Sequence, residues 1–115
     1  MKRSKGLLYG RTTDGSVYVA GLGKCTDTNI VIPPICRGKS VTSIGTNAFN
    51  YCYGMAYYDF RASKSVPTLS NTNAFGSIPS DCKIVVPDSL YDTWIAATNW
   101  STHASKIIKT SEFNG

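Results

Sequence analysis

The side chains that could do chemistry are few in this sequence, and no spacing between them is typical of a reactive site. The candidates are one histidine, His103, and four cysteines, Cys25, Cys36, Cys52 and Cys82. No two cysteines have the C-x-x-C spacing of a zinc or redox motif, and one histidine cannot supply a histidine-rich metal cage. Nothing near His103 indicates a Cys–His pair, and its polar surroundings favour a surface position. We therefore predict no metal site and no catalytic residue.

The acidic residues and the glycines do not indicate catalysis either. Seven acidic residues are present, and none forms a recognisable acid–base pair. Asp88 and Asp92 lie where a helix is expected to begin. Acidic side chains stabilise the start of a helix, so their presence there needs no catalytic role. The segment 21–25, GLGKC, lacks the G-x-x-x-x-G-K-[ST] spacing of a phosphate loop. The sequence thus predicts a protein that is not an enzyme and that binds no cofactor.

Composition and charge predict one globular domain over residues 1–115. Hydrophobic residues make up 42% of the chain and charged residues 17%, so a folded core is expected rather than disorder. No apolar run approaches the ~18 residues that a membrane helix needs, and the apolar part of MKRSKGLLYG is too short for a signal peptide. We expect neither membrane insertion nor an export signal in this chain. Without export, buried thiols are the expected state of the cysteines, and disulfides are the alternative.

One phrase of the sequence occurs twice. TNAF stands at 46–49 and at 72–75, and each copy follows KSV and a short apolar stretch. A period of this length, with one short strand and one helical turn in each unit, is typical of leucine-rich repeats. Stacking of the units would bury Phe49 against Phe75. KSV recurs after 25 residues and TNAF after 26, so one extra residue near Asn71 predicts a bulge or a loosened turn.

The two ends of the chain have patterns of their own. Alternating apolar residues on either side of Asp14-Gly15 predict a hairpin that covers the first unit. The units divide the chain into a hairpin at 7–20, a first repeat at 29–54, a second repeat at 55–81, and a partial repeat with a terminal cap at 82–113. Their strands are expected at 29–34, 56–60 and 83–89.

The last segment changes to a helical period. Leu90, Trp94 and Ala97 recur at helical spacing, which predicts a helix over 89–98 with Ser89 and Asp92 as its capping box. A turn is expected at Asn99, then a short helical piece at 101–105 and a last strand at 106–109. A segment of this different composition would cover the open end of a repeat array.

The first unit, IVIP…GKSVTSIGTNAFNYC, resembles the BspA-type leucine-rich repeat, whose units read roughly I-x-I-P-x-x-V-T-S-I-G-x-x-A-F-x-x-C. The matching positions are Ile30, Ile32, Pro33, Val41, Ile44, Gly45, Ala48, Phe49 and Cys52. The tail from Cys82 resembles the terminal segment of the same proteins, and the likeness covers 7–113. The second unit departs from the pattern, because AYYDF replaces I-x-I-P. The resemblance implies a β-dominated α/β fold: a short leucine-rich-repeat-like solenoid with an N-terminal β-hairpin and a C-terminal helical cap, and a small buried cysteine at Cys52.

Domains of this family encoded in phages and prophages sit in tail, baseplate or other minor structural proteins. The resemblance therefore implies a non-enzymatic recognition or structural module in a virion that is assembled in the host cytoplasm. Its partner would be a host cell-surface glycan or protein, or a neighbouring virion protein. Two alternatives stay open: a cytoplasmic phage-encoded interaction protein that modulates a host factor, and a fragment of a bacterial cell-surface adhesin. An oligomer is compatible with each of them, and no recognised nucleic-acid-binding module is present.

The basic residues of the two units correspond to each other. Arg37 and Lys39 match Arg61 and Lys64, and stacked strands lie about 5 Å apart, which predicts a stripe of cations on one side. Such a stripe is typical of contact with anionic material, and a solvated row of turns is the alternative interpretation.

Aromatic side chains gather where the first unit ends and the second begins, in YCYGMAYYDF at 51–60. Neighbouring strand residues face opposite ways, so Tyr57 and Tyr58 cannot both point into the core. We therefore predict a binding face formed by Tyr57, Tyr58, Arg61 and Lys64, with Arg37 and Lys39 beside it. Core filling with ordinary exposure at an edge is the competing interpretation.

Overall fold

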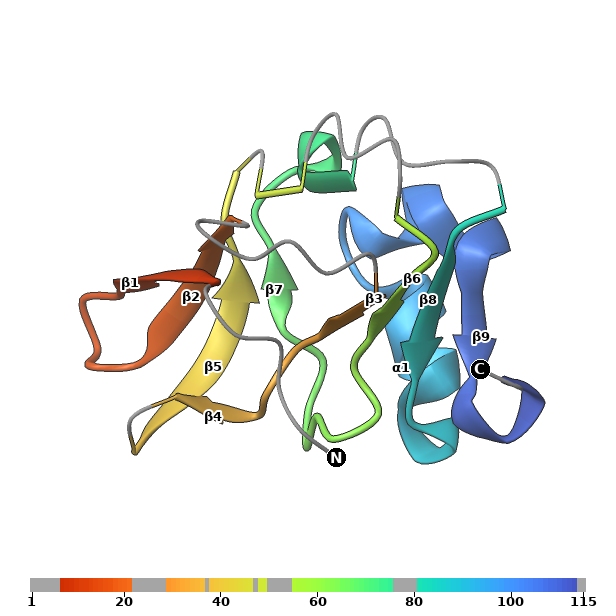
Figure 1. Ribbon diagram of the computed structural model, residues 1–115, viewed down its shortest axis with the longest axis horizontal. Coiled ribbons are helices and arrows are strands. Elements are labelled where there is room, and N and C mark those ends of the chain that lie inside the picture. Colours follow the sequence, from red (N-terminus) through yellow and green to blue (C-terminus); the bar gives the residue numbers. More distant parts are fainter. Residues whose placement is uncertain are drawn as a thin grey trace.

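The computed structural model describes residues 7–21, 29–36, 38–46, 48–49, 55–75 and 81–113 (Figure 1). Short strands dominate, and the helical elements gather in the last third of the chain, so the fold is a β-dominated α/β domain. The strands are β1 Leu8–Arg11, β2 Val17–Gly21, β3 Asn29–Val31, β4 Ile35–Cys36, β5 Lys39–Ile44, β6 Tyr57–Asp59, β7 Thr68–Leu69, β8 Lys83–Val86 and β9 Ile107–Lys109. The helical elements are the α-helix α1 Tyr91–Ala96 and the 3₁₀ turns η1 Thr72–Phe75, η2 Asp88–Leu90, η3 Trp100–Lys106 and η4 Thr110–Glu112.

The strands form two sheets, which are seen at the left and the right of Figure 1. In the first sheet, β1 and β2 form the predicted antiparallel hairpin, β2 lies parallel to β5, and β5 lies parallel to β7. In the second sheet, β3, β6, β8 and β9 are all parallel. The pass from β3 to β5 therefore contributes β3 to the second sheet and the antiparallel pair β4 and β5 to the first. The pass from β6 to β7 contributes one strand to each sheet.

The two TNAF passages lie side by side, as their likeness predicted. The rings of Phe49 and Phe75 are stacked, with centroids 5.5 Å apart, and the Phe49 N–H donates to the Ala74 carbonyl at 2.8 Å. The strands before them pair with an offset of 25 residues, since Ile44 lies opposite Leu69. Phe49 and Phe75, however, are 26 positions apart. The second pass therefore contains one residue more than the first, and this residue lies between the end of β7 and η1. The extra residue thus lies near Asn71, where it was predicted.

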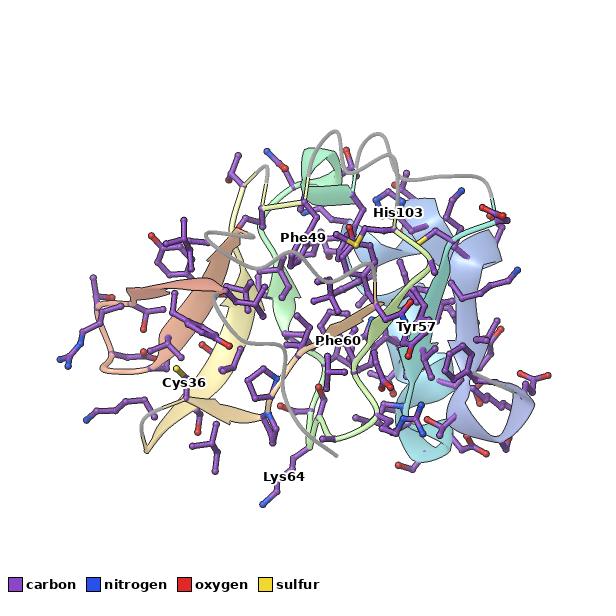
Figure 2. The ribbon with its side chains drawn as sticks, in the orientation of Figure 1. Cys36, Phe49, Tyr57, Phe60, Lys64 and His103 are labelled. Atoms are coloured by element: carbon purple, nitrogen blue, oxygen red, sulfur yellow. The ribbon has the colours of Figure 1, made fainter. Side chains whose placement is uncertain are left out.

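Aromatic rings fill the space between the sheets, where Phe49 and Phe60 lie in Figure 2. The ring of Tyr58 is fully buried, with its centroid 4.7 Å from that of Phe49 and 4.9 Å from that of Phe75. Phe60 packs against Trp94 and Trp100, which come from the helical segment. Large rings bury much apolar area, so this cluster is a main source of stability in so short a chain.

The helical segment follows the predicted order but begins differently. The chain enters α1 through η2, so the residue at the start of α1 is Leu90, which makes no side-chain capping bond. The predicted capping box of Ser89 and Asp92 is therefore wrong, and the Asp88 carboxylate accepts a bond from the Ser111 N–H at 3.0 Å instead. The predicted turn at Asn99 is confirmed by its positive φ of 68°, and η3 and β9 follow it.

Two further observations bear on the chemistry of the chain. Cys36 and Cys82 are both buried, whereas Cys25 and Cys52 lie outside the described residues. Within the described part of the chain, no helix combines the length and the apolar character that crossing a lipid bilayer would require.

Candidate functional site

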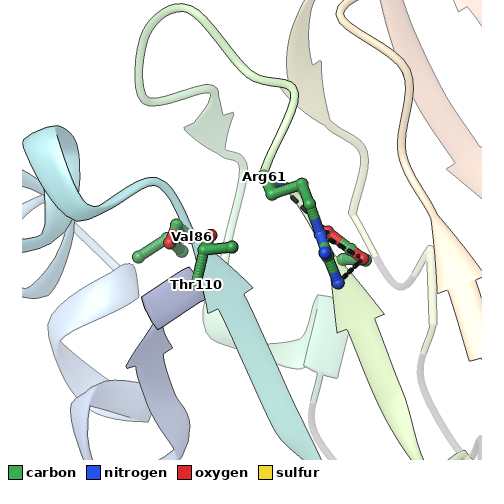
Figure 3. Close-up of polar contacts among 4 residues, drawn as sticks. Arg61, Val86 and Thr110 are labelled. Carbon is green, nitrogen blue, oxygen red and sulfur yellow. Dashed lines mark hydrogen bonds and ion pairs between the residues drawn. The ribbon is translucent and has the colours of Figure 1, made fainter. Parts of the chain in front are cut away.

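The predicted binding face is not assembled as a set of free contact residues. Arg61 forms an ion pair with the buried carboxylate of Asp59, with Nη2–Oδ2 and Nε–Oδ2 distances of 2.8 and 2.9 Å (Figure 3). Its guanidinium also lies over the ring of Phe113, 5.6 Å from the centroid. Arg61, which was predicted as a binding residue, is therefore engaged by Asp59 and Phe113. Its charge balances a carboxylate that would otherwise be buried alone, which is costly.

The two tyrosines have separate environments. Tyr57 is half-buried, and its ring meets the edge of Phe113 with centroids 4.7 Å apart. The prediction that Tyr58 belongs to an exposed face is wrong, because its side chain points into the core and is 0% exposed. The pleat of β6 places these neighbours on opposite faces, as the sequence pattern required, but the face that carries Tyr57 is largely covered.

Arg37 lies outside the described residues, and the two predicted lysines are exposed. Lys64 projects from the lower edge of the molecule in Figure 2. Lys39 lines a hollow of about 320 Å³ together with Arg11, which no pattern in the sequence marks as a binding residue. We call this space the cationic hollow; its lining residues are Leu7, Leu8, Tyr9, Gly10, Arg11, Val17, Cys36 and Lys39.

Two pairings along the first sheet bring Arg11 and Lys39 to the same hollow. Arg11 lies opposite Val17 in the β1–β2 hairpin, and Val17 lies opposite Val41 where β2 meets β5. Lys39 begins β5 directly after a tight turn at Gly38, whose φ of 79° suits a residue without a side chain. The hairpin over 7–20 was predicted, but its strand partner was not, and Arg11 could be found only with that partner known.

The charge of the cationic hollow is not balanced from within. Its described lining contains no acidic residue, and neither Arg11 nor Lys39 forms an ion pair with any residue that the structure describes. The walls are apolar, with Leu7, Val17 and Cys36 buried. Leu8 at the rim is 54% exposed, the most open of the large hydrophobic side chains in the described part of the chain. A negatively charged group with an apolar neighbour matches this surface.

Among the described residues that line the hollow, the Cys36 thiol, the Lys39 amine and the Tyr9 hydroxyl are possible nucleophiles, and no histidine or carboxylate lies in that lining beside them. Over the described residues, His, Cys, Asp and Glu do not gather in a group of three that could hold a metal ion.

Comparison of the chain with family models, with curated proteins and with solved structures finds no match. A functional proposal must therefore rest on the residues, their geometry and the resemblance of the repeat unit.

Proposed function

We propose that this chain is a short BspA-like leucine-rich-repeat solenoid that works as a non-enzymatic recognition module. It binds a negatively charged partner through the cationic hollow. The parallel pairing of successive passes supports the repeat interpretation, since β5 pairs with β7 at an offset of 25 residues, β6 with β8 at 26 and β3 with β6 at 28. Offsets of 25 and 26 also separate the two KSV and the two TNAF phrases.

One observation carries the binding proposal: Arg11 and Lys39 share a hollow whose described lining has no acidic residue. Like charges held near each other repel, and the repulsion is relieved when an anion lies between them. The exposed Leu8 adds apolar contact, so the partner is a macromolecule or a substituted anion rather than a bare ion.

The virion-associated role rests on the resemblance to BspA-like domains of phages and prophages. In that setting the partner is an anionic component of the host surface or an acidic patch of a neighbouring virion protein. Genes for tail or baseplate proteins on either side of the gene for this chain support the role. A solitary gene among host-takeover genes contradicts it.

Retention on immobilised heparin, a general polyanion, tests the binding proposal. The double substitution Arg11→Gln and Lys39→Gln is compared with Lys83→Gln and Lys106→Gln, which removes two positive charges elsewhere on the surface. We expect the first pair to elute at clearly lower salt than the second. Equal elution of the two pairs would mean that only net charge matters, and the proposal would fail. Circular dichroism confirms that each variant is folded.

A further inference from the structure

A second hollow lies next to the cationic hollow, on the other side of the β4–β5 hairpin. It has a volume of about 250 Å³, and we call it the hydroxyl hollow. Its lining includes one cation, Lys64, and three apolar residues, among them Ile35. It also includes four hydroxyl groups, from Ser40, Thr42, Ser63 and Ser65. As in the cationic hollow, no acidic residue is found in the described lining, and Lys64 has no ion-pair partner among the described residues.

The β4–β5 hairpin separates the two hollows. Each of the two residue pairs of this hairpin lines a different hollow. Cys36 and Lys39, which face each other across the hairpin, both line the cationic hollow. The next pair, Ile35 and Ser40, lines the hydroxyl hollow. The two spaces are therefore neighbours that share one thin wall.

The repeat places an equivalent lysine in each hollow. The parallel pairing of β5 with β7 matches residues that are 25 positions apart, such as Ser43 and Thr68. Lys39 and Lys64 are separated by the same 25 positions, each as the first residue of a KSV phrase. The same residue type thus recurs at the same place in the two KSV phrases, once in each hollow.

We infer that the two hollows together bind a linear anionic polysaccharide, whose successive units lie on either side of the hairpin. This inference rests on the proposed function and names the class of its ligand. Cations in two neighbouring hollows, Arg11 and Lys39 in one and Lys64 in the other, fit a ligand whose negative charges repeat along a chain. The hydroxyl groups around Lys64 can donate to and accept from sugar hydroxyls. Ile35, which is 49% exposed, offers apolar contact to the face of a sugar ring.

Binding at two linked positions makes the affinity depend on ligand length, because the second contact becomes intramolecular once the first has formed. A long chain gains from both hollows, whereas a fragment that reaches only one does not. One exposed charge contact contributes roughly 1 kcal/mol, which corresponds to about a fivefold change in affinity.

The test compares heparin disaccharide, long heparin chains and linear polyphosphate by titration calorimetry. The variants are Lys64→Gln, Lys39→Gln and the matched control Lys83→Gln, which removes an exposed charge outside both hollows. We expect Lys64→Gln to weaken binding of the long heparin chains about fivefold relative to the control. We expect the wild-type protein to prefer long heparin to its disaccharide, and to prefer heparin to polyphosphate.

The outcomes separate this inference from the proposed function. If Lys39→Gln weakens binding of long heparin and Lys64→Gln does no more than Lys83→Gln, the two-hollow inference fails and the cationic hollow stands. If neither substitution exceeds the control, both fail. Equal affinity for polyphosphate and heparin would overturn the assignment to a polysaccharide, since polyphosphate has the charge without the sugar hydroxyls.

Discussion

The side-chain amide of Asn99 donates a hydrogen bond to the backbone carbonyl of Leu69 at 2.7 Å, across 30 residues of sequence. The same peptide unit bonds in the other direction, because the Ser70 N–H donates to the Ile44 carbonyl at 3.1 Å. The N–H and C=O of a trans peptide point opposite ways, so the carbonyl of Leu69 faces away from β5. Asn99 thus occupies the place where the N–H of a next strand would lie.

Two neighbouring side chains act on the same segment. The indole Nε1–H of Trp100 donates to the Pro67 carbonyl at 2.7 Å, and His103 Nε2 lies 3.2 Å from the Thr72 carbonyl oxygen. Unpaired strand edges invite association with other chains. Side chains from the turn after α1 and from η3 therefore hydrogen-bond the backbone carbonyls along and beside β7, and among the described residues no further strand is added to this edge of the sheet.

The first prediction concerns the Asn99 bond. Asn99→Asp keeps the side-chain shape but replaces the donor with a carboxylate beside the Leu69 carbonyl. We expect the free energy of unfolding to fall by about 1–3 kcal/mol, because a donor to a partly buried carbonyl is lost. Urea unfolding measures the change. Thr98→Asp adds the same charge at the exposed neighbouring position and should cost much less; equal losses would show that charge, not the bond, is responsible.

The second prediction concerns the stacked phenylalanines. Phe75 is 1% exposed and contacts the rings of Phe49, Tyr58 and Trp100. Phe75→Ala should lower the free energy of unfolding by about 3–5 kcal/mol, because it leaves a cavity between the sheets. Phe113→Ala, which truncates a half-buried ring on the outer face, is the control and should cost clearly less. A similar loss for both variants would contradict the central place of Phe75 in the core.

The third prediction concerns pH and His103. A carbonyl oxygen can only accept, so Nε2 carries the proton that Thr72 binds, and a second proton must go to Nδ1. Burial lowers the pKa of His103 below its ordinary 6.5, and the charge of Lys106 lowers it further, although the Thr72 bond opposes both. The unfolded chain then binds the second proton more tightly than the folded protein does.

The contribution of His103 to stability is therefore complete above about pH 6.5 and decreases as the pH falls below that value. It levels off once the pH has passed the lowered folded-state pKa. Urea unfolding from pH 8 to pH 5 measures the change. His103→Gln retains a donor but cannot titrate, so the decrease that begins near pH 6.5 should disappear in this variant. An unchanged pH profile would assign the decrease to other groups.

The fourth prediction concerns the turn between β1 and β2. The Asp14 carboxylate accepts bonds from the Ser16 hydroxyl at 2.6 Å, from the Thr12 hydroxyl and from the Ser16 N–H at 3.0 Å. These bonds, that of the Ser16 hydroxyl first, lower the pKa of Asp14 from 3.8 to about 2. Any stabilisation from this charge is present above pH 3.8 and is lost as the pH falls through the lowered pKa.

A carboxyl-carbon NMR titration of Asp14 measures this pKa directly. Ser16→Ala should raise it toward 3.8, because the variant lacks the hydroxyl that contributes most. Ser111→Ala is a matched control, since it removes a hydroxyl that acts on Asp88 instead. A wild-type Asp14 that titrates at the ordinary value would contradict the bonding seen in the turn.

Several parts of the architecture could be predicted because they depend on local pattern. The hairpin around Asp14-Gly15, the strand at KIVV and the order of the helical segment follow from turn residues and from periods of two and 3.6. The stacking of Phe49 on Phe75 followed from a duplicated phrase, since repeated units bury their apolar sides against each other.

The errors share one physical cause. Tyr58 and Arg61 lie in the same short segment. The sequence gives their residue types but not the side chains that contact them in the folded protein. Arg61 is covered by Phe113, which is more than fifty positions away in the chain. Its ion-pair partner, Asp59, is only two positions away, but the side-chain contact between them is seen only in the folded chain. The prediction of a capping box was wrong for a related reason: a 3₁₀ turn precedes α1, so the helix begins later than expected. The Asp88 carboxylate accepts a hydrogen bond from the Ser111 N–H, from a distant part of the chain.

By itself, the sequence determined the repeat, its period and the alternation that puts Tyr57 and Tyr58 on opposite faces, because these depend on residues that are near one another in the chain. Only the tertiary structure decided which cations remain without a partner and which of them meet. Arg11 reaches Lys39 through the pairing of β2 with β5, and Arg61 is neutralised by Asp59. Charge acts through space, so the binding surface depends on distances that the linear order of residues does not contain.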